Sequence, residues 1–272
     1  LRTICAELAS QNEVSTWHEF MKLVNGEARF PKILKTGLRL DEFADIECGA
    51  LTFVSGWPSN GKSSVLQHLA VSMARKNKDL KILYVATDDV PMKAMAGFIG
   101  IITGMPKSDI KMMIETKQFL GNPQADVKLD EIQELFSHQI IMRGLKECSS
   151  TDKVKQEIAN IRKKHDRDLL VVVDAMNNLD DIKKDDQRVG IENAIRNFKN
   201  MAVTYDAALI PVSHLTKQDG KEGERPRLKN LKGTSFIEYE AKTVLLVHMD
   251  AHYHKKTELR WRCGSSMFPV VE

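Results

Sequence analysis

The chain has 272 residues, of which 42% are hydrophobic and 28% are charged, enough apolar material for one large core or a core with a small appendage. Its 40 basic and 37 acidic residues give a formal net charge of +3, so a nucleic-acid partner has to be sought in local clusters of charge. No apolar run reaches the roughly 18 residues of a membrane span, and the first residues do not resemble a signal peptide, so we expect neither feature.

The four cysteines stand far apart in the chain, at positions 5, 48, 148 and 263. They form neither a C-x-x-C pair nor the spacing of a metal site, which is typical of a reducing compartment. We therefore expect the cytoplasm, the nucleoid, a phage-infected cell or the mitochondrial matrix, and not secretion. Because the sequence starts at Leu1, we also expect it to be part of a longer protein.

Residues 1–45 are polar, have a helical tendency and are interpreted as an arm or linker. They contain a short amphipathic patch, formed by Trp17, Phe20, Met21, Leu23 and Val24. We expect a domain boundary near residue 45, with residues 46–272 as the main domain.

A phosphate-binding pattern, G-x-x-x-x-G-K-S, follows the first predicted strand. Residues 50–55 are apolar, β-branched and aromatic and predict a buried parallel strand, whereas apolar residues recur at helical spacing from Val65 through Arg75. The pattern therefore joins a strand to the start of a helix, as a nucleotide-binding P-loop requires. The predicted nucleotide-binding residues are Gly56, Pro58, Ser59, Asn60, Gly61, Lys62, Ser63 and Ser64.

The residue types of this loop suit a nucleoside triphosphate. Glycines at 56 and 61 allow backbone N–H groups to face a phosphate, and the following helix adds its positive dipole end. Lys62 is expected to reach the β- and γ-phosphates, and the Ser63 hydroxyl to coordinate Mg²⁺. The alternative is a glycine-rich turn that carries a lysine by chance.

The second predicted strand, residues 81–87, ends in the pair Asp88-Asp89. A carboxylate at the end of the strand after a P-loop helix can polarise the water that attacks the γ-phosphate, because ligands of open α/β sheets lie outside these strand ends. A turn-forming acidic pair is the alternative. The helix that follows carries a methionine-rich face, including Met92 and Met95, which we interpret as core.

Residues 103–137 are predicted to be mostly helical, and residues 139–142 a short strand. Ser150 or Thr151 caps the next predicted helix. The apolar strand after it, residues 169–174, ends in Asp174. An aspartate in this place, about 110 residues beyond a P-loop, predicts a second magnesium-organising group opposite Ser63.

Another buried strand, residues 208–213, follows a predicted exposed loop at 177–188 and a helix, and it delivers His214 at its end. We favour a functional histidine because it follows the strand next in sequence to that of Asp174, although most lone histidines are structural. A final strand at 243–248 precedes a predicted hairpin, in which Arg260 and Arg262 lie two residues apart on one face.

Basic residues cluster between the predicted strands at 208–213 and 243–248, among glycines and a proline. Such a flexible basic loop is an electrostatic footprint for a nucleic-acid backbone, whereas an ordinary solvated loop is the alternative because three acidic residues dilute the charge. The predicted DNA-binding residues are Lys217, Lys221, Arg225, Arg227, Lys229 and Lys232.

The succession of these motifs resembles the RecA-type motor domain of ring-forming replicative helicases. The P-loop, the strand-end carboxylate, Val-Val-Asp, Ser-His-Leu-Thr-Lys, Leu-Lys-Gly-Thr-Ser-Phe-Ile-Glu and Arg-Trp-Arg follow one another from about Leu34 to the C-terminus. The resemblance is to the bacterial DnaB family and, more closely, to the Twinkle-like primase-helicases of phages and mitochondria. It implies an α/β fold, a RecA-like P-loop NTPase core with a central, mostly parallel sheet flanked by helices.

The resemblance also implies roles for single residues. Asp88 stands where the family has a catalytic glutamate, whose side chain is one methylene longer than that of aspartate. Asp174 stands where the family has its magnesium-organising aspartate. His214 is similar to a γ-phosphate sensor. Arg262 matches an arginine finger that reaches the neighbouring subunit's nucleotide, and Arg260 matches a basic residue, usually lysine, two positions earlier. The basic loop corresponds to the segment that grips single-stranded DNA.

The function implied is an ATP- and Mg²⁺-dependent DNA helicase that moves 5′ to 3′ on single-stranded DNA as a hexameric or heptameric ring, with primase or polymerase as possible further partners. A RecA- or KaiC-like recombinase ATPase is one alternative. A hydrolysis-poor loader or scaffold is the other, because Asp88 is shorter than the family's glutamate.

Overall fold

The computed structural model describes residues 16–26, 30–183, 187–215, 225–231, 234–249, 260–263 and 266–269, with the last two segments described by their backbone only. Contacts divide the chain into two compact units, Leu1–Lys32 and Ile33–Glu272, which we describe separately. The expected domain boundary near residue 45 stays a prediction.

The described part of the N-terminal unit is helix α2, Thr16–Val24. The expected amphipathic patch lies on it. The rings of Trp17 and Phe20 are 5.5 Å apart, and both side chains are about half exposed.

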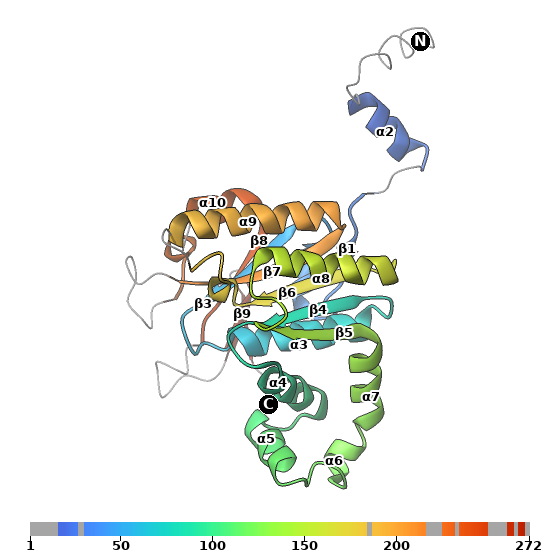
Figure 1. Ribbon diagram of the computed structural model, residues 1–272, viewed down its shortest axis with the longest axis vertical. Coiled ribbons are helices and arrows are strands. Elements are labelled where there is room, and N and C mark those ends of the chain that lie inside the picture. Colours follow the sequence, from blue (N-terminus) through green and yellow to red (C-terminus); the bar gives the residue numbers. More distant parts are fainter. Residues whose placement is uncertain are drawn as a thin grey trace. The chain divides into compact units, whose positions relative to one another are not determined.

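The larger unit is built on a six-stranded sheet in the order β5-β4-β6-β7-β3-β8, in which every neighbouring pair is parallel (Figure 1). The predicted RecA-like fold class is thereby confirmed. The strands are β3 Leu51–Gly56, β4 Lys81–Ala86, β5 Ile140–Gly144, β6 Leu169–Asp174, β7 Ala207–His214 and β8 Ala241–Val247. Two small antiparallel pairs complete the strands of the described ranges, β1 Ile33–Leu34 with β2 Ile46–Glu47 and β9 Arg260–Cys263 with β10 Ser266–Pro269.

Helices cover both faces of the sheet, with α3 and α4 on one side and α8 and α9 on the other (Figure 1). Helices α5, α6 and α7 extend from α4 and lead to β5 through one π-helical turn, Leu135–Gln139. Short 3-10 turns connect several elements, namely η1 Arg39–Glu42, η3 Met176–Asn178 and η5 Leu228–Asn230. The helices are α3 Lys62–Lys76, α4 Pro91–Thr103, α5 Lys107–Glu115, α6 Pro123–Asp126, α7 Leu129–Glu134, α8 Thr151–Lys164, α9 Gln187–Thr204 and α10 Thr234–Glu240.

The core consists of two apolar layers, one on each face of the sheet. Successive side chains of a strand point to opposite faces. In β6, Leu170 and Val172 therefore pack with α3 and α4, while Val171 and Val173 pack with α8 and α9. All of these strand residues are at most 1% exposed, which explains why the strands read as continuous apolar runs in the sequence.

Most predicted elements are confirmed, with two corrections. Met92 is 64% exposed because it lies in the first turn of α4, so it is not part of the core, while Met95 packs on a small cluster with Ile110 and Met113. The expected loop at 177–188 begins within the buried turn η3 and gives way to α9 at Gln187. None of the helices in the described ranges combines the length and apolar character needed to cross a bilayer.

Candidate active site

The predicted site residues come together at the carboxyl edge of the sheet. In the register of β3 with β7, Gly56 is the partner of His214. In the register of β4 with β6, Ala86 is the partner of Asp174, and Asp88 follows directly. Because β6 and β7 are also neighbours, the four strand ends lie side by side. A P-loop, two acidic groups and a histidine therefore share one edge.

The P-loop has the backbone that its glycines predict. Gly61 has a φ of 78°, a left-handed conformation that glycine adopts without strain. A Cβ at Gly56 would lie 2.5 Å from the carbonyl oxygen of Val247 at the end of β8, so only glycine fits there. These two positions fix the turn that carries the chain from β3 into α3.

Lys62 lies folded back over this turn. Its Nζ donates hydrogen bonds to the carbonyl oxygens of Gly56, at 3.1 Å, and Trp57, at 3.0 Å. Burial lowers the pKa of Lys62, while the charges of Asp174 and Asp88 act in the opposite direction. The ammonium group is thus partly desolvated, and its pKa stays lowered although two carboxylates act on it, so an added phosphate would further stabilise its charge.

The P-loop is held from the side of β8 by Asn60, which is 1% exposed. Its Nδ2 donates to the carbonyl oxygen of Pro58 at 3.0 Å, and its Oδ1 accepts from the N–H of Met249 at 2.8 Å. The side chain of Asn60 thus shapes the loop. Next to it, Ser59 and Pro58 are exposed, as is Ser64.

Ser63 and Asp174 lie in contact, and a buried tyrosine stands behind them. The Ser63 hydroxyl is hydrogen-bonded to the Asp174 carboxylate. The hydroxyl of Tyr84, which is fully buried, donates to Asp174 Oδ2 at 2.8 Å, and Gln67 hydrogen-bonds the same hydroxyl. Burial raises the pKa of Asp174, an effect that the bonds from Ser63 and Tyr84 oppose. The carboxylate is held ready in one orientation.

The two oxygens of Ser63 and Asp174 are the kind of ligand that suits Mg²⁺. This ion binds through one or two protein oxygens and completes its shell with water and substrate phosphates. Among the described residues no group of three or more His, Cys, Asp and Glu side chains could hold a metal ion. The sparse pair at the P-loop therefore fits Mg²⁺ and does not fit a metal that demands a full protein cage.

Asp88 and Asp89 differ in their surroundings. Asp88 Oδ1 accepts a hydrogen bond from Asn178 Nδ2 at 3.1 Å, and its charge acts on both Lys62 and Asp174. The carboxylate of Asp89 lies 3.5 Å from the ammonium of Lys93 and 3.7 Å from that of Lys107. Of the two, Asp88 is the carboxylate whose charge acts on both Lys62 and Asp174.

His214 ends β7 with its backbone fixed. Its N–H donates to Asn177 Oδ1 at 3.0 Å, and Asn177 is 7% exposed. Leu215 then forms a β-bridge with Leu231, which closes the base of the predicted DNA-binding loop. His214 is therefore connected to the predicted DNA-binding loop through the next residue of the chain, Leu215.

The predicted basic residues are seen only in part. Arg225, Arg227 and Lys229 are described at the end of the loop, where all three are exposed, while Lys217, Lys221 and Lys232 lie outside the described residues. Arg260 and Arg262 stand on strand β9, where their backbone partners are Pro269 and Met267, but their side chains lie outside the described part. The roles of these eight residues stay predictions.

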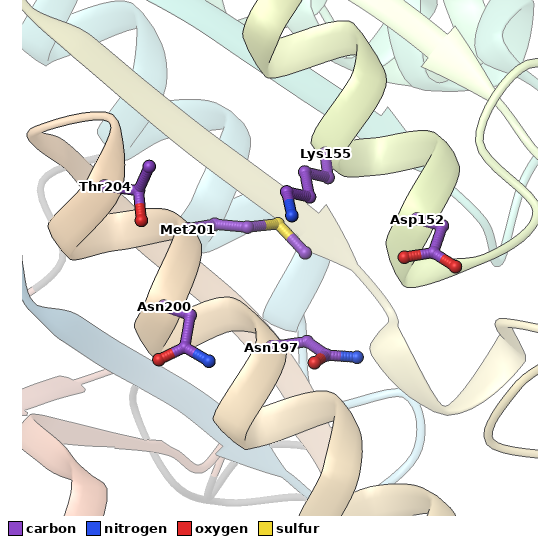
Figure 2. A pocket seen from close by; sticks show the side chains of 6 residues that line it. All are labelled: Asp152, Lys155, Asn197, Asn200, Met201 and Thr204. Carbon is purple, nitrogen blue, oxygen red and sulfur yellow. The ribbon is translucent and has the colours of Figure 1, made fainter.

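A shallow pocket lies elsewhere, between helices α8 and α9 (Figure 2). Two of its side chains come from α8 and four from α9, and none is a predicted site residue. The lining residues are Asp152, Lys155, Asn197, Asn200, Met201 and Thr204.

Sequence reasoning missed three residues of the candidate site, Tyr84, Asn177 and Asn178. Tyr84 is hidden in an apolar strand, where only its hydroxyl gives a reason to ask for a buried partner. The two asparagines lie in a stretch that composition marks as a loop. Their position directly after the strand of Asp174 was the available signal, because polar residues just past strand ends face the ligand edge.

Comparison with known proteins identifies the family and supports the fold. Residues 34–266 match the model of the family described as DnaB-like helicase C terminal domain. Among solved structures, one described as an ATPase domain has a TM-score of 0.75 and 18% identity, over 91% of this chain and 88% of the other. A DnaB-like replicative helicase, studied with its interactions with primase, has a TM-score of 0.72 and 18% identity, over 89% of this chain and 57% of the other. No curated protein sequence matches the chain.

Proposed function

The chain belongs to the DnaB-like helicase C-terminal domain family, and we propose that it is the ATP-driven motor of a ring-shaped replicative DNA helicase. The observation that carries the proposal is the meeting of Lys62, Asp174, Asp88 and His214 at one sheet edge. Family membership supports a helicase motor over the recombinase alternative. The closer resemblance to phage and mitochondrial primase-helicases stays a prediction.

ATP is the proposed substrate, with its phosphates on the backbone N–H groups of the loop from Gly56 to Ser64. Lys62 would exchange its present carbonyl partners for the β- and γ-phosphates. Ser63 and Asp174 would hold Mg²⁺, which neutralises charge on the phosphates when bound. Tyr84 and Gln67 keep the Asp174 carboxylate in place from behind.

Hydrolysis would proceed by water attack on the γ-phosphorus, assisted by Asp88. The Asp88 carboxylate accepts a hydrogen bond from the water and takes up its proton as the new P–O bond forms, while the bond between the γ-phosphorus and the bridging oxygen breaks and that oxygen leaves with ADP. His214 is the partner of Gly56 in the sheet register, which supports its proposed role in sensing the γ-phosphate. When hydrolysis removes the γ-phosphate, His214 would transmit the change to the basic loop, which begins at the Leu215–Leu231 bridge.

The ring, its six or seven copies and 5′-to-3′ movement are proposed from the family resemblance. In such a ring Arg262 of one copy would complete the ATP site of the next, with Arg260 beside it. The basic loop would grip the phosphates of single-stranded DNA, which the exposure of Arg225 and Lys229 supports. Primase is proposed as a partner because a similar helicase was solved with that interaction in view.

A hydrolysis-poor loader or scaffold is the second candidate, favoured by the short side chain of Asp88. It would bind ATP tightly and release little phosphate. A reducing compartment such as the cytoplasm is proposed for either function, because the cysteines show no pairing or metal spacing in the sequence.

The experiment that tests the proposal is Mg²⁺-dependent ATP turnover of the purified chain, with and without single-stranded DNA. Lys62→Ala serves as the inactive control because it removes the phosphate-binding ammonium. We expect turnover that DNA stimulates and that the control lacks. Tight binding of a fluorescent ATP analogue without phosphate release under either condition would select the scaffold instead.

A further inference from the structure

The turn η3, directly after β6, lies between the end of β4 and the end of β7. Its Met176 is fully buried and its Asn177 is 7% exposed, so the turn is firmly packed. Its two asparagines reach in opposite directions. Asn177 Oδ1 accepts a hydrogen bond from the backbone N–H of His214, whereas Asn178 Nδ2 donates a hydrogen bond to the Asp88 carboxylate.

The position of Asp88 relative to Asp174 is fixed by several bonds around this turn. The N–H groups of Thr87 and Asp88 both donate to the carbonyl oxygen of Asp174, at 2.7 and 3.1 Å. Asn178 Nδ2 lies 3.1 Å from Asp88 Oδ1 and 3.4 Å from the carbonyl oxygen of Thr87. Backbone bonds thus place the residue, and Asn178 alone sets the direction of its side chain among the described contacts.

The hydrogen bond engages one of the two carboxylate oxygens. The described residues make no hydrogen bond to the other oxygen, Oδ2. A carboxylate held through Oδ1 keeps Oδ2 for a water molecule. Asp89 has no such arrangement because its oxygens face the ammonium groups of Lys93 and Lys107.

We propose that Asn178 is the positioning residue for the water-activating carboxylate of ATP hydrolysis, acting on the nucleotide through Asp88. This inference rests on the proposed function. The amide holds Oδ1 so that Oδ2 accepts the hydrogen bond of the attacking water and then its proton. A side chain as short as aspartate needs this support, since a displacement of about 1 Å in a reacting group can lower a rate about 10²-fold.

The test uses the full chain with Mg²⁺ and compares Asn178→Ala with the isosteric Asn178→Asp. Single-turnover phosphate release, affinity for a fluorescent ATP analogue and Tm are measured for each. Asn197→Ala is the matched control, because Asn197 Nδ2 makes one hydrogen bond, to Thr151 Oγ1 at 3.1 Å, and its side chain lines the pocket between α8 and α9 (Figure 2).

We expect both Asn178 variants to release phosphate about 10- to 100-fold more slowly. Nucleotide affinity should be unchanged, and Tm should fall no further than in the control. The decisive measurement is Asn178→Ala on an Asp88→Asn background. On this background the Asn178→Ala substitution should slow phosphate release hardly at all, because a residue that acts through the Asp88 carboxylate has no carboxylate left to position.

Single variants as fast as Asn197→Ala would overturn the assignment alone, as would the full loss repeated on the Asp88→Asn background. Loss of nucleotide affinity in both Asn178 variants would also overturn it, since the role would then be in binding. A wild-type chain without turnover would overturn the proposed function and this assignment together.

Discussion

Two polar regions of the molecule, the carboxyl edge of the sheet and the pocket between α8 and α9, differ in how their side chains are assembled. The edge draws on four parallel strands and on residues from Gly56 to His214. The pocket draws on two helices only (Figure 2). Both contain asparagines, at least one acidic group and a lysine.

The two regions differ in how deeply their charged side chains are buried. At the edge, Asp174 is 6% exposed, and burial raises the pKa of its carboxyl and lowers that of the Lys62 ammonium. In the pocket, Asp152 and Lys155 are exposed on one helix face. A pocket lined by exposed polar residues is therefore weaker evidence for a functional site than a group of buried charged residues with shifted pKa values.

The largest expected effect tests whether the ATP site of one subunit needs an arginine from the neighbouring subunit. Arg262→Ala should leave nucleotide binding intact and lower turnover about 10³- to 10⁵-fold, the range for arginines that act from a neighbouring subunit. ATPase assays check this, with Arg188→Ala, which breaks an exposed ion pair with Glu192, as control.

Mixing two inactive variants tests the same point in trans. In a mixed ring, some sites combine Lys62 of the Arg262→Ala copy with Arg262 of the Lys62→Ala copy. Turnover should reappear on mixing. If the mixture stays inactive while Arg262→Ala still assembles with the Lys62→Ala copy, Arg262 does not act between subunits.

The next effect separates the two neighbouring carboxylates. Asp88→Asn removes the proton acceptor and should lower turnover about 10²- to 10⁴-fold. Asp89→Asn removes surface ion pairs worth about 0.2–1 kcal/mol in stability and should leave turnover nearly unchanged. Phosphate release measured for both variants decides. The opposite order would move the catalytic role to Asp89.

A smaller effect concerns stability without nucleotide. Because burial raises the pKa of Asp174, its ionised form costs stability, and the cost grows as the pH rises from the ordinary aspartate pKa through the raised one. Asp174→Asn should therefore raise Tm at pH 7, by about 2–4 °C per kcal/mol, and the gain should shrink in acid. Turnover should be lost at the same time.

The pocket provides the control for this change. Asp152→Asn removes an exposed acidic group from the first turn of α8, where it stabilises the helix dipole, and should lower stability by about 0.3–1 kcal/mol. Thermal unfolding of the two variants should thus shift in opposite directions. A stabilising Asp152→Asn or a destabilising Asp174→Asn would contradict the contrast between the regions.

The smallest expected effect is that of Asn200→Ala in the pocket. A surface substitution without a buried partner changes stability by about 0.5 kcal/mol or less. ATP turnover, DNA stimulation and Tm should all match the wild type. A loss of DNA stimulation would mean that the pocket takes part in function after all.

The sequence by itself determined the elements and most of the candidate chemistry. The P-loop pattern fixed its own strand, turn and helix, because each part needs particular residue types at adjacent positions. Apolar runs ending in Asp88, Asp174 and His214 predicted strands whose ends face a ligand. The family resemblance followed from the residues of these and the later motifs together with their order.

Only the tertiary structure decided which of these residues touch. The neighbours of a strand in a parallel sheet lie far away in sequence, so the placement of Asp88 beside Asn178, 90 residues later, has no local signal. The same holds for Tyr84 behind Asp174, which reads as one more residue of an apolar strand. Local periodicity sets which face of an element is buried, whereas contacts between side chains depend on sheet order and register, which emerge only when the whole chain packs.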